Sequence, residues 1–311
     1  MGKLIEKDLG RKSNYAIIRH GLSEILMTEK FYPAIFVLLW ASAFISAVYG
    51  LTGSGPFSYL FVRFIIVAII FALMVLIFHA RWLERKQILP TVAVGVLMHG
   101  FYLGGVFYAI SLGTSAGVSS LIASSHPVVT AMLARPLTGE RVSPLQWLGI
   151  VLGFGGVLAV VWPRLGGELP VMGLVTCAIA AIGMSLATGV QKRFGGGIDL
   201  LTGNAVQALA AAVFFGLLLM LVEPFYFEMT APVVLSLVWV ILFVSLGAIS
   251  ILMLLIRKGR MAATSSLFFL VPPVSALLGY LVFDEQLGLI GIFGFVLASI
   301  GVWLVNRQPS G

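Results

Sequence analysis

The stretch 120–160, SLIASSHPVVTAMLARPLTGERVSPLQWLGIVLGFGGVLAV, decides the fold because the chain contains it twice. Residues 265–305, SSLFFLVPPVSALLGYLVFDEQLGLIGIFGFVLASIGVWLV, repeat it without a gap at a constant offset of 145. Each copy reads as an apolar helix with an internal proline, a short polar link with a glutamate, and a second apolar helix rich in small residues. Identical pairs include Ser120 and Ser265, Pro127 and Pro272, Glu140 and Glu285, and Gly156 and Gly301. The repeat predicts a tandem of two related units.

The composition places the chain in a membrane. Sixty per cent of its 311 residues are hydrophobic and 10% are charged, and the mean hydropathy is +1.08. Its apolar runs are continuous and about 20 residues long, whereas barrel strands would alternate polar and apolar positions, so we expect an all-α bundle in the lipid bilayer. The net charge of +7 does not indicate a nucleic-acid partner, because the basic residues occupy short links rather than one basic surface.

The chain divides into two five-helix units between two short tails. Residues 1–30 are polar and carry both signs of charge, which predicts a cytoplasmic tail or an amphipathic surface helix rather than a signal peptide. The first unit covers residues 31–165, the second covers residues 166–306, and residues 307–311 form the C-terminal tail. The ten expected spans lie at 33–50, 56–79, 88–109, 114–134, 144–162, 170–191, 199–222, 231–256, 261–282 and 287–305.

The distribution of positive charge predicts the orientation. All but two of the 19 Lys and Arg residues fall in the N-terminal tail or in alternate links on one side. The exceptions are Arg164, on the other side, and Arg63, inside a span. By the positive-inside rule both termini are cytoplasmic. Because each unit has five spans, the second unit is inverted, an architecture found in alternating-access transporters.

Ionisable side chains inside the spans are few, namely Arg63, His99 and His126, and no span has a central Asp or Glu. A charge in the middle of a bilayer is costly, so each should face protein or water. Arg63 could bind a carboxylate substrate, or it could pair structurally or extend to the interface. His99 could line a cavity or pack as a neutral hydrogen-bonded side chain. A carboxylate proton relay is not predicted.

Further candidates come from residue type and place in the span. Trp40 and Trp239 lie well inside their spans, and with Tyr102 they could form an aromatic cavity wall or pack in the core. Pro127 and Pro272 would bend their helices, either as static kinks or as hinges that line a central path. Glu140 and Glu285 precede helices, where they could cap the helix dipole or join an ion pair at a gate.

Small residues form one stripe on the second helix of each copy: Gly149, Gly153 and Gly156, and then Gly294, Ala298 and Gly301. Such stripes let helices approach closely, either within the subunit or across a homodimer. The residues 113–117 match the G-x-S-x-G pattern of serine hydrolases, but the expected helices on both sides and the absence of a strand make this match accidental. Cys177, the single cysteine, lies in an apolar span and excludes an internal disulfide.

Several of these motifs together resemble the EamA transporters of the drug/metabolite transporter superfamily. The motifs are Trp40-Ala41-Ser42, Arg63-Phe64, the block from Ala116 through Pro127 to Arg141, and its second copy from Thr264 through Pro272 to Glu285. Asp284 departs from this pattern, which usually has glycine there. The resemblance implies a bundle of two inverted five-helix repeats around a central cavity, which exports amino acids or related small metabolites.

We therefore expect a multi-pass exporter of the cell (inner) membrane that works by alternating access, with no cofactor and no metal ion. The candidate substrate-binding residues are Trp40, Arg63, His99, Tyr102, Ser124, Ser185 and Trp239, and the candidate hinge and gate residues are Pro127, Pro272, Glu140 and Glu285. Aromatic substrates are slightly favoured by the two tryptophans and the tyrosine. The alternatives are an exporter of drug-like or other metabolites, a membrane-embedded enzyme that uses Ser115, and a channel.

Overall fold

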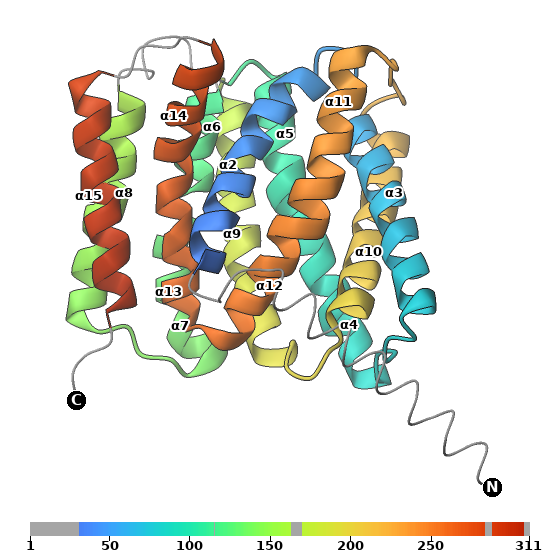
Figure 1. The fold of residues 1–311 in the computed structure, drawn as a ribbon, viewed down its shortest axis with the longest axis horizontal. Coiled ribbons are helices and arrows are strands. Elements are labelled where there is room, and N and C mark those ends of the chain that lie inside the picture. The colour runs from blue at the N-terminus through green and yellow to red at the C-terminus, as the bar shows by residue number, and fades with distance from the viewer. Residues whose placement is uncertain (1–30, 115, 163–169, 284–287, 308–311) are drawn as a thin grey trace, which may run out of the picture.

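The computed structural model describes residues 31–114, 116–162, 170–283 and 288–307, and these residues form a bundle of long, roughly parallel and antiparallel helices (Figure 1). The all-helical prediction is confirmed over these ranges, where the only β feature is an isolated bridge between Ser54 and Phe227. The elements of the first half are α2 (Tyr32–Gly50), α3 (Pro56–Ile77), α4 (Arg85–Val94), η2 (Gly95–Leu103), α5 (Gly104–Ser111), α6 (Ala116–Ala123), α7 (His126–Thr138) and α8 (Pro144–Val161). Those of the second half are α9 (Val171–Phe194), α10 (Leu200–Leu221), α11 (Ala231–Trp239), η4 (Val240–Ala248), α12 (Ile249–Lys258), α13 (Met261–Ser266), η5 (Leu267–Leu270), α14 (Val271–Phe283) and α15 (Leu289–Asn306).

The bounds of the helices repeat at the offset of 145 that the sequence shows. Adding 145 to the limits of α8 gives those of α15, and adding it to α7 gives α14. The same offset relates the two π-helical segments, η2 at Gly95–Leu103 and η4 at Val240–Ala248. Such wide turns are rare and are often found at functional sites. Their recurrence at equivalent positions indicates that both halves share one backbone plan.

Nine helices in the described ranges are long and apolar enough to cross a membrane. They match nine of the ten expected spans. The remaining one, expected at 114–134, is interrupted at Ser124 and Ser125 between α6 and α7. Pro127 occupies the first turn of α7, where its missing N–H costs no intrahelical hydrogen bond. The count of ten spans stays a prediction.

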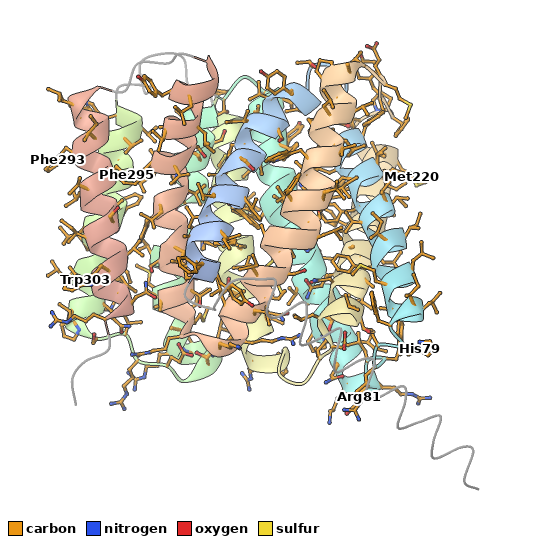
Figure 2. The ribbon with its side chains drawn as sticks, in the orientation of Figure 1. His79, Arg81, Met220, Phe293, Phe295 and Trp303 are labelled. Atoms are coloured by element: carbon orange, nitrogen blue, oxygen red, sulfur yellow. The ribbon has the colours of Figure 1, made fainter. Side chains whose placement is uncertain are left out.

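The two ends of the bundle differ in charge. Every described Lys and Arg except Arg63 lies at or beyond a helix end on one face, which we call the basic face (the lower face in Figures 1 and 2). Glu223 and Glu228 lie in the link between α10 and α11 on the opposite face. Between the two faces, apolar side chains such as Met220 and Phe293 project outward from the bundle (Figure 2). This belt is typical of a surface in contact with lipid.

Helices α8 and α15 pack together through the two small-residue stripes. A Cβ atom added to Gly156 would lie 2.4 Å from the backbone nitrogen of Ala298, and one added to Gly301 would lie 2.4 Å from that of Gly153. The backbones therefore approach as closely as small residues allow. The stripes serve packing within the chain, and a homodimer through these faces remains a prediction.

The start of α8 is fixed by local chemistry. Ser143 and Gln146 form a capping box, in which each side chain accepts a hydrogen bond from the backbone N–H of the other. The Gln146 amide also donates to the carbonyl of Val305, 3.1 Å away. This contact joins the start of α8 to the end of α15 on the basic face.

Candidate functional site

A cluster of aromatic rings fills the middle of the bundle where the two halves meet. It comprises Phe36 and Trp40 of α2, Tyr102 of η2, His126 of α7 and Phe268 of η5, all buried. The Trp40 ring centroid lies 6.1 Å from that of Tyr102 and 5.3 Å from that of Phe268. The His126 ring meets Phe268 edge-on at 4.3 Å. Offset and edge-on contacts of this kind stabilise aromatic packing, so in this conformation the cluster closes the centre of the bundle.

The serines predicted for the site lie beside this aromatic cluster. Ser185 donates to the carbonyl oxygen of His126 at 2.9 Å and to that of Ala181, one turn earlier. The offset of 145 makes Ser185 the equivalent of Trp40. Ser124 lies at the break between α6 and α7, and its buried hydroxyl has no hydrogen-bond partner in the described part of the chain. The Nε2 atom of His126 likewise has none.

Arg63 lies at a second buried position, between the π-helical segments of the two halves. Its side chain has 0% exposure, and its Nε donates to the hydroxyl of Ser245 in η4 at 3.0 Å. The guanidinium carbon lies 5.2 Å from the ring centre of Phe64, and that ring lies 4.9 Å from the ring of His99 in η2. The structure therefore places both Arg63 and His99 next to Phe64.

This arginine cluster has two buried polar atoms without a hydrogen-bond partner in the described ranges, namely Nη2 of Arg63 and Nδ1 of His99. Leaving a buried polar atom without a partner costs about 1–3 kcal/mol, and more if the group is charged. An ion pair joins Lys86 to Glu84 at the basic face, away from this cluster. No carboxylate described in the structure neutralises Arg63.

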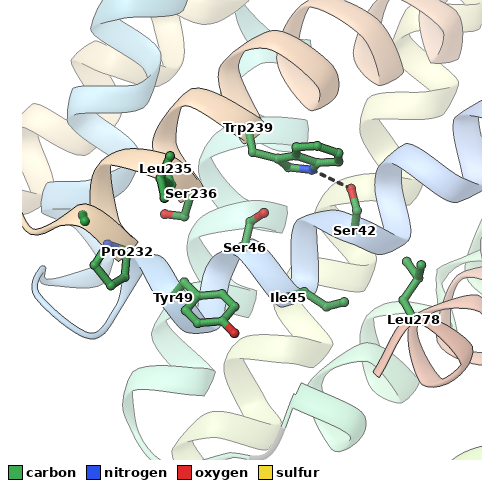
Figure 3. A pocket seen from close by; sticks show the side chains of 10 residues that line it. Ser42, Ile45, Ser46, Tyr49, Pro232, Leu235, Ser236, Trp239 and Leu278 are labelled. Atoms are coloured by element: carbon green, nitrogen blue, oxygen red, sulfur yellow. Dashed lines mark hydrogen bonds between the residues drawn. The ribbon is translucent and has the colours of Figure 1, made fainter. Parts of the chain in front are cut away.

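A groove of about 550 Å³ opens between α2 and α11, in the half of the bundle away from the basic face (Figure 3). Its lining is mostly apolar but includes the hydroxyls of Ser42, Ser46 and Ser236. Trp239 lies in this groove with 39% exposure, and its indole N–H donates to Ser42 at 2.9 Å. Trp239 thus faces the groove, whereas Trp40 is buried and contacts Tyr102.

A hydrogen bond links the groove to the arginine cluster. The hydroxyl of Ser236, in the lining of the groove, lies 3.0 Å from the buried hydroxyl of Tyr59. Tyr59 precedes Arg63 by four residues on α3, so the two side chains lie on the same side of that helix. The lining of the groove is therefore hydrogen-bonded to the turn of α3 that precedes Arg63.

The two halves are tied together at the basic face. Oε2 of Glu140 accepts a hydrogen bond from the backbone N–H of Met261 at 2.8 Å, which caps the start of α13. The Arg260 guanidinium of the second half donates to the backbone carbonyl of Arg141 in the first half. Capping is one of the two roles considered for Glu140, although the helix it caps belongs to the other half. Its equivalent, Glu285, lies outside the described residues.

The opposite face has its own contact between the halves, and sequence reasoning missed it. Oε1 of Glu223 accepts hydrogen bonds from the backbone N–H groups of Phe57 and Ser58 at 3.0 Å and from the Ser58 hydroxyl at 3.2 Å. These donors are at the start of α3, where a carboxylate is favoured by the helix dipole. Glu223 follows the apolar stretch of α10 by two residues, and an acidic residue at that position could have suggested a contact with a helix start.

Two pairs of groups in the links have shifted acidities. The ammonium of Lys86, 2.8 Å from Glu84, lowers the pKa of that carboxyl group through a hydrogen bond and charge attraction. A hydrogen bond to Glu228 raises the pKa of the Tyr226 hydroxyl. Both pairs lie at the surface, so they stabilise the links only weakly.

The two candidate hinge prolines lie in differently shaped backbone. Pro127 follows the break between α6 and α7. In the second half, the 3₁₀ segment η5 joins α13 to α14 without a break, and Pro272 is the second residue of α14. Equivalent stretches of the two halves therefore differ in conformation at their prolines.

The structure offers no support for hydrolase chemistry at the G-x-S-x-G match. Ser115 itself lies outside the described residues, and the chain on either side of it is helical, in α5 and α6. Within the part of the chain that the structure describes, no group of three or more His, Cys, Asp or Glu side chains could hold a metal ion.

The structure thus groups the candidate residues into three places. Trp40, Tyr102 and Ser185 gather at the aromatic cluster with Ser124 nearby in sequence, Arg63 and His99 form the arginine cluster, and Trp239 lines the groove. The sequence analysis missed Phe268 and Ser245. The offset of 145 could have suggested Ser245, because it is equivalent to Gly100, which adjoins His99.

Comparison with known proteins places both halves in one family. The sequence pattern of the EamA-like transporter family matches residues 30–162 and again residues 171–307. The uncharacterized transporter YvbV of Bacillus subtilis is 25% identical over 285 residues, which cover 88% of this chain and 90% of that protein. The uncharacterized inner membrane transporter YedA of Escherichia coli K12 is 25% identical over 293 residues, covering 89% of this chain and 93% of YedA.

A solved crystal structure has the same fold, with a TM-score of 0.73 at 19% identity over 89% of this chain and 96% of the other. The two family matches together include all nine membrane-length helices of the described ranges. The chain belongs to the EamA-like transporter family and is a multi-pass membrane transporter.

Proposed function

We propose that this transporter exports amino acids or related small metabolites across the cell (inner) membrane by alternating access. The observation that carries the proposal is an asymmetry between the two ends of the bundle. At the basic face Glu140 ties one half to the other, and the aromatic cluster closes the centre. Away from the basic face, a groove of about 550 Å³ is open between α2 and α11. Glu223 also joins the halves on that opposite face, so the open groove is the feature that distinguishes the two ends.

The repeated backbone plan supports this mechanism. Two halves that share their last two helices and a π-helical segment at the same offset can, if related by inversion, exchange conformations and so present a site to each side in turn. The proposal includes ten spans, with the basic face and both termini in the cytoplasm, because positive residues are retained on the cytoplasmic side. In this orientation the open groove of the present conformation faces outward.

The candidate substrate site lies between the aromatic cluster and the arginine cluster. Rings of Trp40 and Tyr102 can contact an apolar or aromatic side chain, while Arg63 can bind a carboxylate. An amino acid carries both features. An exporter of drug-like or other metabolites is the second candidate, favoured by the mostly apolar lining of the groove.

Counterflow in liposomes tests the proposal. Vesicles that contain the purified protein are preloaded with one of a panel of unlabelled amino acids, nucleosides and drug-like cations, and uptake of each labelled compound is followed. We expect saturable, accelerated exchange for at least one amino acid. Exchange confined to other compounds would remove the amino-acid part of the proposal and retain the carrier.

Two results would contradict a carrier. Conductance without saturation or counterflow would indicate a channel. Loss of function on Ser115→Ala with normal folding would indicate a membrane-embedded enzyme, whereas a carrier should tolerate this change.

A further inference from the structure

The charge of Arg63 has no counterion that the chain can supply within the membrane. None of the nine membrane-length helices contains an Asp or Glu, nor do α6 and α7. Its Nε donates to a neutral hydroxyl, that of Ser245, and its Nη2 is without a partner in the described ranges. An unneutralised charge in the middle of a membrane is expensive. A guanidinium is protonated under all physiological conditions, so it cannot escape this cost by losing a proton.

The surroundings of Arg63 suit a ligand that moves with the transport cycle. The Arg63 side chain starts on α3 of the first half and donates to η4 of the second half, and Phe64 beside it contacts His99 of η2. Position 100 in η2 and position 245 in η4 are equivalent by the offset of 145. Arg63 therefore contacts one π-helical segment directly, and its neighbour Phe64 contacts the equivalent segment of the other half.

The route to Arg63 is short. The contact between Ser236 and Tyr59 separates it from the open groove, and both side chains of this contact are neutral hydroxyl groups. Tyr59 lies one turn before Arg63 on α3, so this contact joins the lining of the groove to the part of α3 that carries Arg63.

We infer that Arg63, held by Ser245, binds the carboxylate of the transported molecule, so that the substrates of this transporter are organic carboxylates. The inference rests on the proposed carrier function and narrows its substrate class. A carboxylate neutralises the buried charge and accepts hydrogen bonds from the guanidinium. The planar guanidinium matches the geometry of a carboxylate better than any other donor group. No spanning helix offers a carboxylate for an ammonium group, so an amino group on the substrate is dispensable.

Paired ligands test the substrate class without any mutation. Thermal unfolding of the purified protein in nanodiscs is measured with 3-phenylpropionate, 3-phenylpropanamide, phenylalanine, phenylalaninamide, acetate and chloride. A ligand that binds the folded state raises the unfolding temperature in proportion to its saturation. We expect the carboxylates to stabilise and each amide to bind about 10- to 100-fold more weakly. We also expect 3-phenylpropionate to match phenylalanine within about threefold, since the amino group is dispensable.

Variants then assign the effect to Arg63. Arg63→Gln should abolish stabilisation by carboxylates, and Arg63→Lys should retain part of it, because the charge remains while the planar fork is lost. Ser245→Ala keeps the charge and loses only the positioning hydroxyl, so it should weaken binding and preserve the preference for acid over amide. Arg81→Gln, at an exposed position of the basic face, is the matched control and should behave as the wild type.

Counterflow of the same ligands separates failure of this inference from failure of the proposed function. Stabilisation by carboxylates that needs Arg63, without exchange of any compound, would support the binding site and contradict the carrier. Exchange of acid and amide at equal rates, or an unchanged acid preference in Arg63→Gln, would overturn the inference and retain the carrier. If Arg63→Gln does not fold, equal stabilisation by acid and amide in the Ser245→Ala and wild-type proteins overturns it. Stabilisation by chloride alone would overturn it as well, in favour of an inorganic anion site.

Discussion

The hydrogen bond from Met261 to Glu140 makes a quantitative prediction about opening of the basic face. Glu140 follows α7, and it caps α13 of the other half at 2.8 Å. This bond must break whenever α7 and α13 separate. Removal of a cap costs about 0.5–2 kcal/mol, and hydrogen bonds to charged groups contribute about 1.5–3 kcal/mol. Because Glu140 is partly exposed, we take about 1–2 kcal/mol, which corresponds to a 5- to 30-fold change in a two-state equilibrium.

The change is measured as the rate at which a buried position becomes reactive. Ala262, the second residue of α13, has 3% exposure, and Cys177 is the single native cysteine. Ala262→Cys in a Cys177→Ala background gives a reporter that a maleimide reaches only when this contact opens. We expect Glu140→Ala to raise the labelling rate about 5- to 30-fold. Glu140→Gln, which keeps an acceptor and loses the charge, should raise it about 2- to 5-fold.

The control variant removes a carboxylate cap that lies within one half and so does not join the two halves. Asp199 caps α10 on the basic face by accepting from Leu201 at 2.9 Å, only two residues away. Asp199→Ala should therefore leave labelling of Ala262→Cys close to the reference rate. Equal acceleration by Asp199→Ala would show general loosening. An unchanged rate in Glu140→Ala would refute the assignment of Glu140 to closure of the basic face.

Three further predictions concern packing, the groove and the opposite face. Gly301→Ala places a methyl group 2.4 Å from a backbone nitrogen of α8. It should lower the free energy of unfolding by about 1–3 kcal/mol relative to Gly291→Ala, whose methyl group meets nothing within 4 Å. Thermal unfolding in detergent measures the difference. Trp239→Phe removes the indole donor of the groove and should raise the substrate concentration for half-maximal counterflow about 2- to 10-fold, with an unchanged value excluding the groove from the path. Glu223→Ala removes the acceptor of three hydrogen bonds at the start of α3 and should lower the unfolding temperature, whereas Glu228→Ala, at an exposed position of the same link, should lower it less.

The architecture was predictable from sequence because the repeat is a one-dimensional signal. Two stretches that match without a gap must build similar elements, and the observed limits of α7 and α14 differ by the offset of the sequence match. The π-helical segments were not predictable. Their helices are apolar on most sides, so the spacing of polar residues contains no record of one extra residue per turn.

The site was predictable by residue type and only partly by grouping. A buried Arg63 follows from the cost of a charge in the membrane, and the structure does bury it. That Trp40 meets Tyr102 while Trp239 faces a separate groove depends on how α2 packs against its neighbours. No periodicity along one helix specifies such a contact. Phe268 was missed for the same reason, because a phenylalanine in an apolar helix has the same pattern whether it faces lipid, core or site.

The two proline-containing stretches are equivalent in sequence but differ in backbone conformation. Residues 116–138 and 261–283 match in sequence register and in outer limits, yet the first stretch is broken at Ser124 and Ser125 and the second is continuous through η5. A difference in backbone between two equivalent stretches is expected if each can adopt both shapes and the present conformation holds one of each. The shapes should then exchange when the basic face opens, so that η5 breaks. Hydrogen exchange at the amides of residues 267–270 should accordingly accelerate in Glu140→Ala relative to the wild type, and protection that stays equal in the two proteins would indicate that the two stretches differ only because their side chains differ.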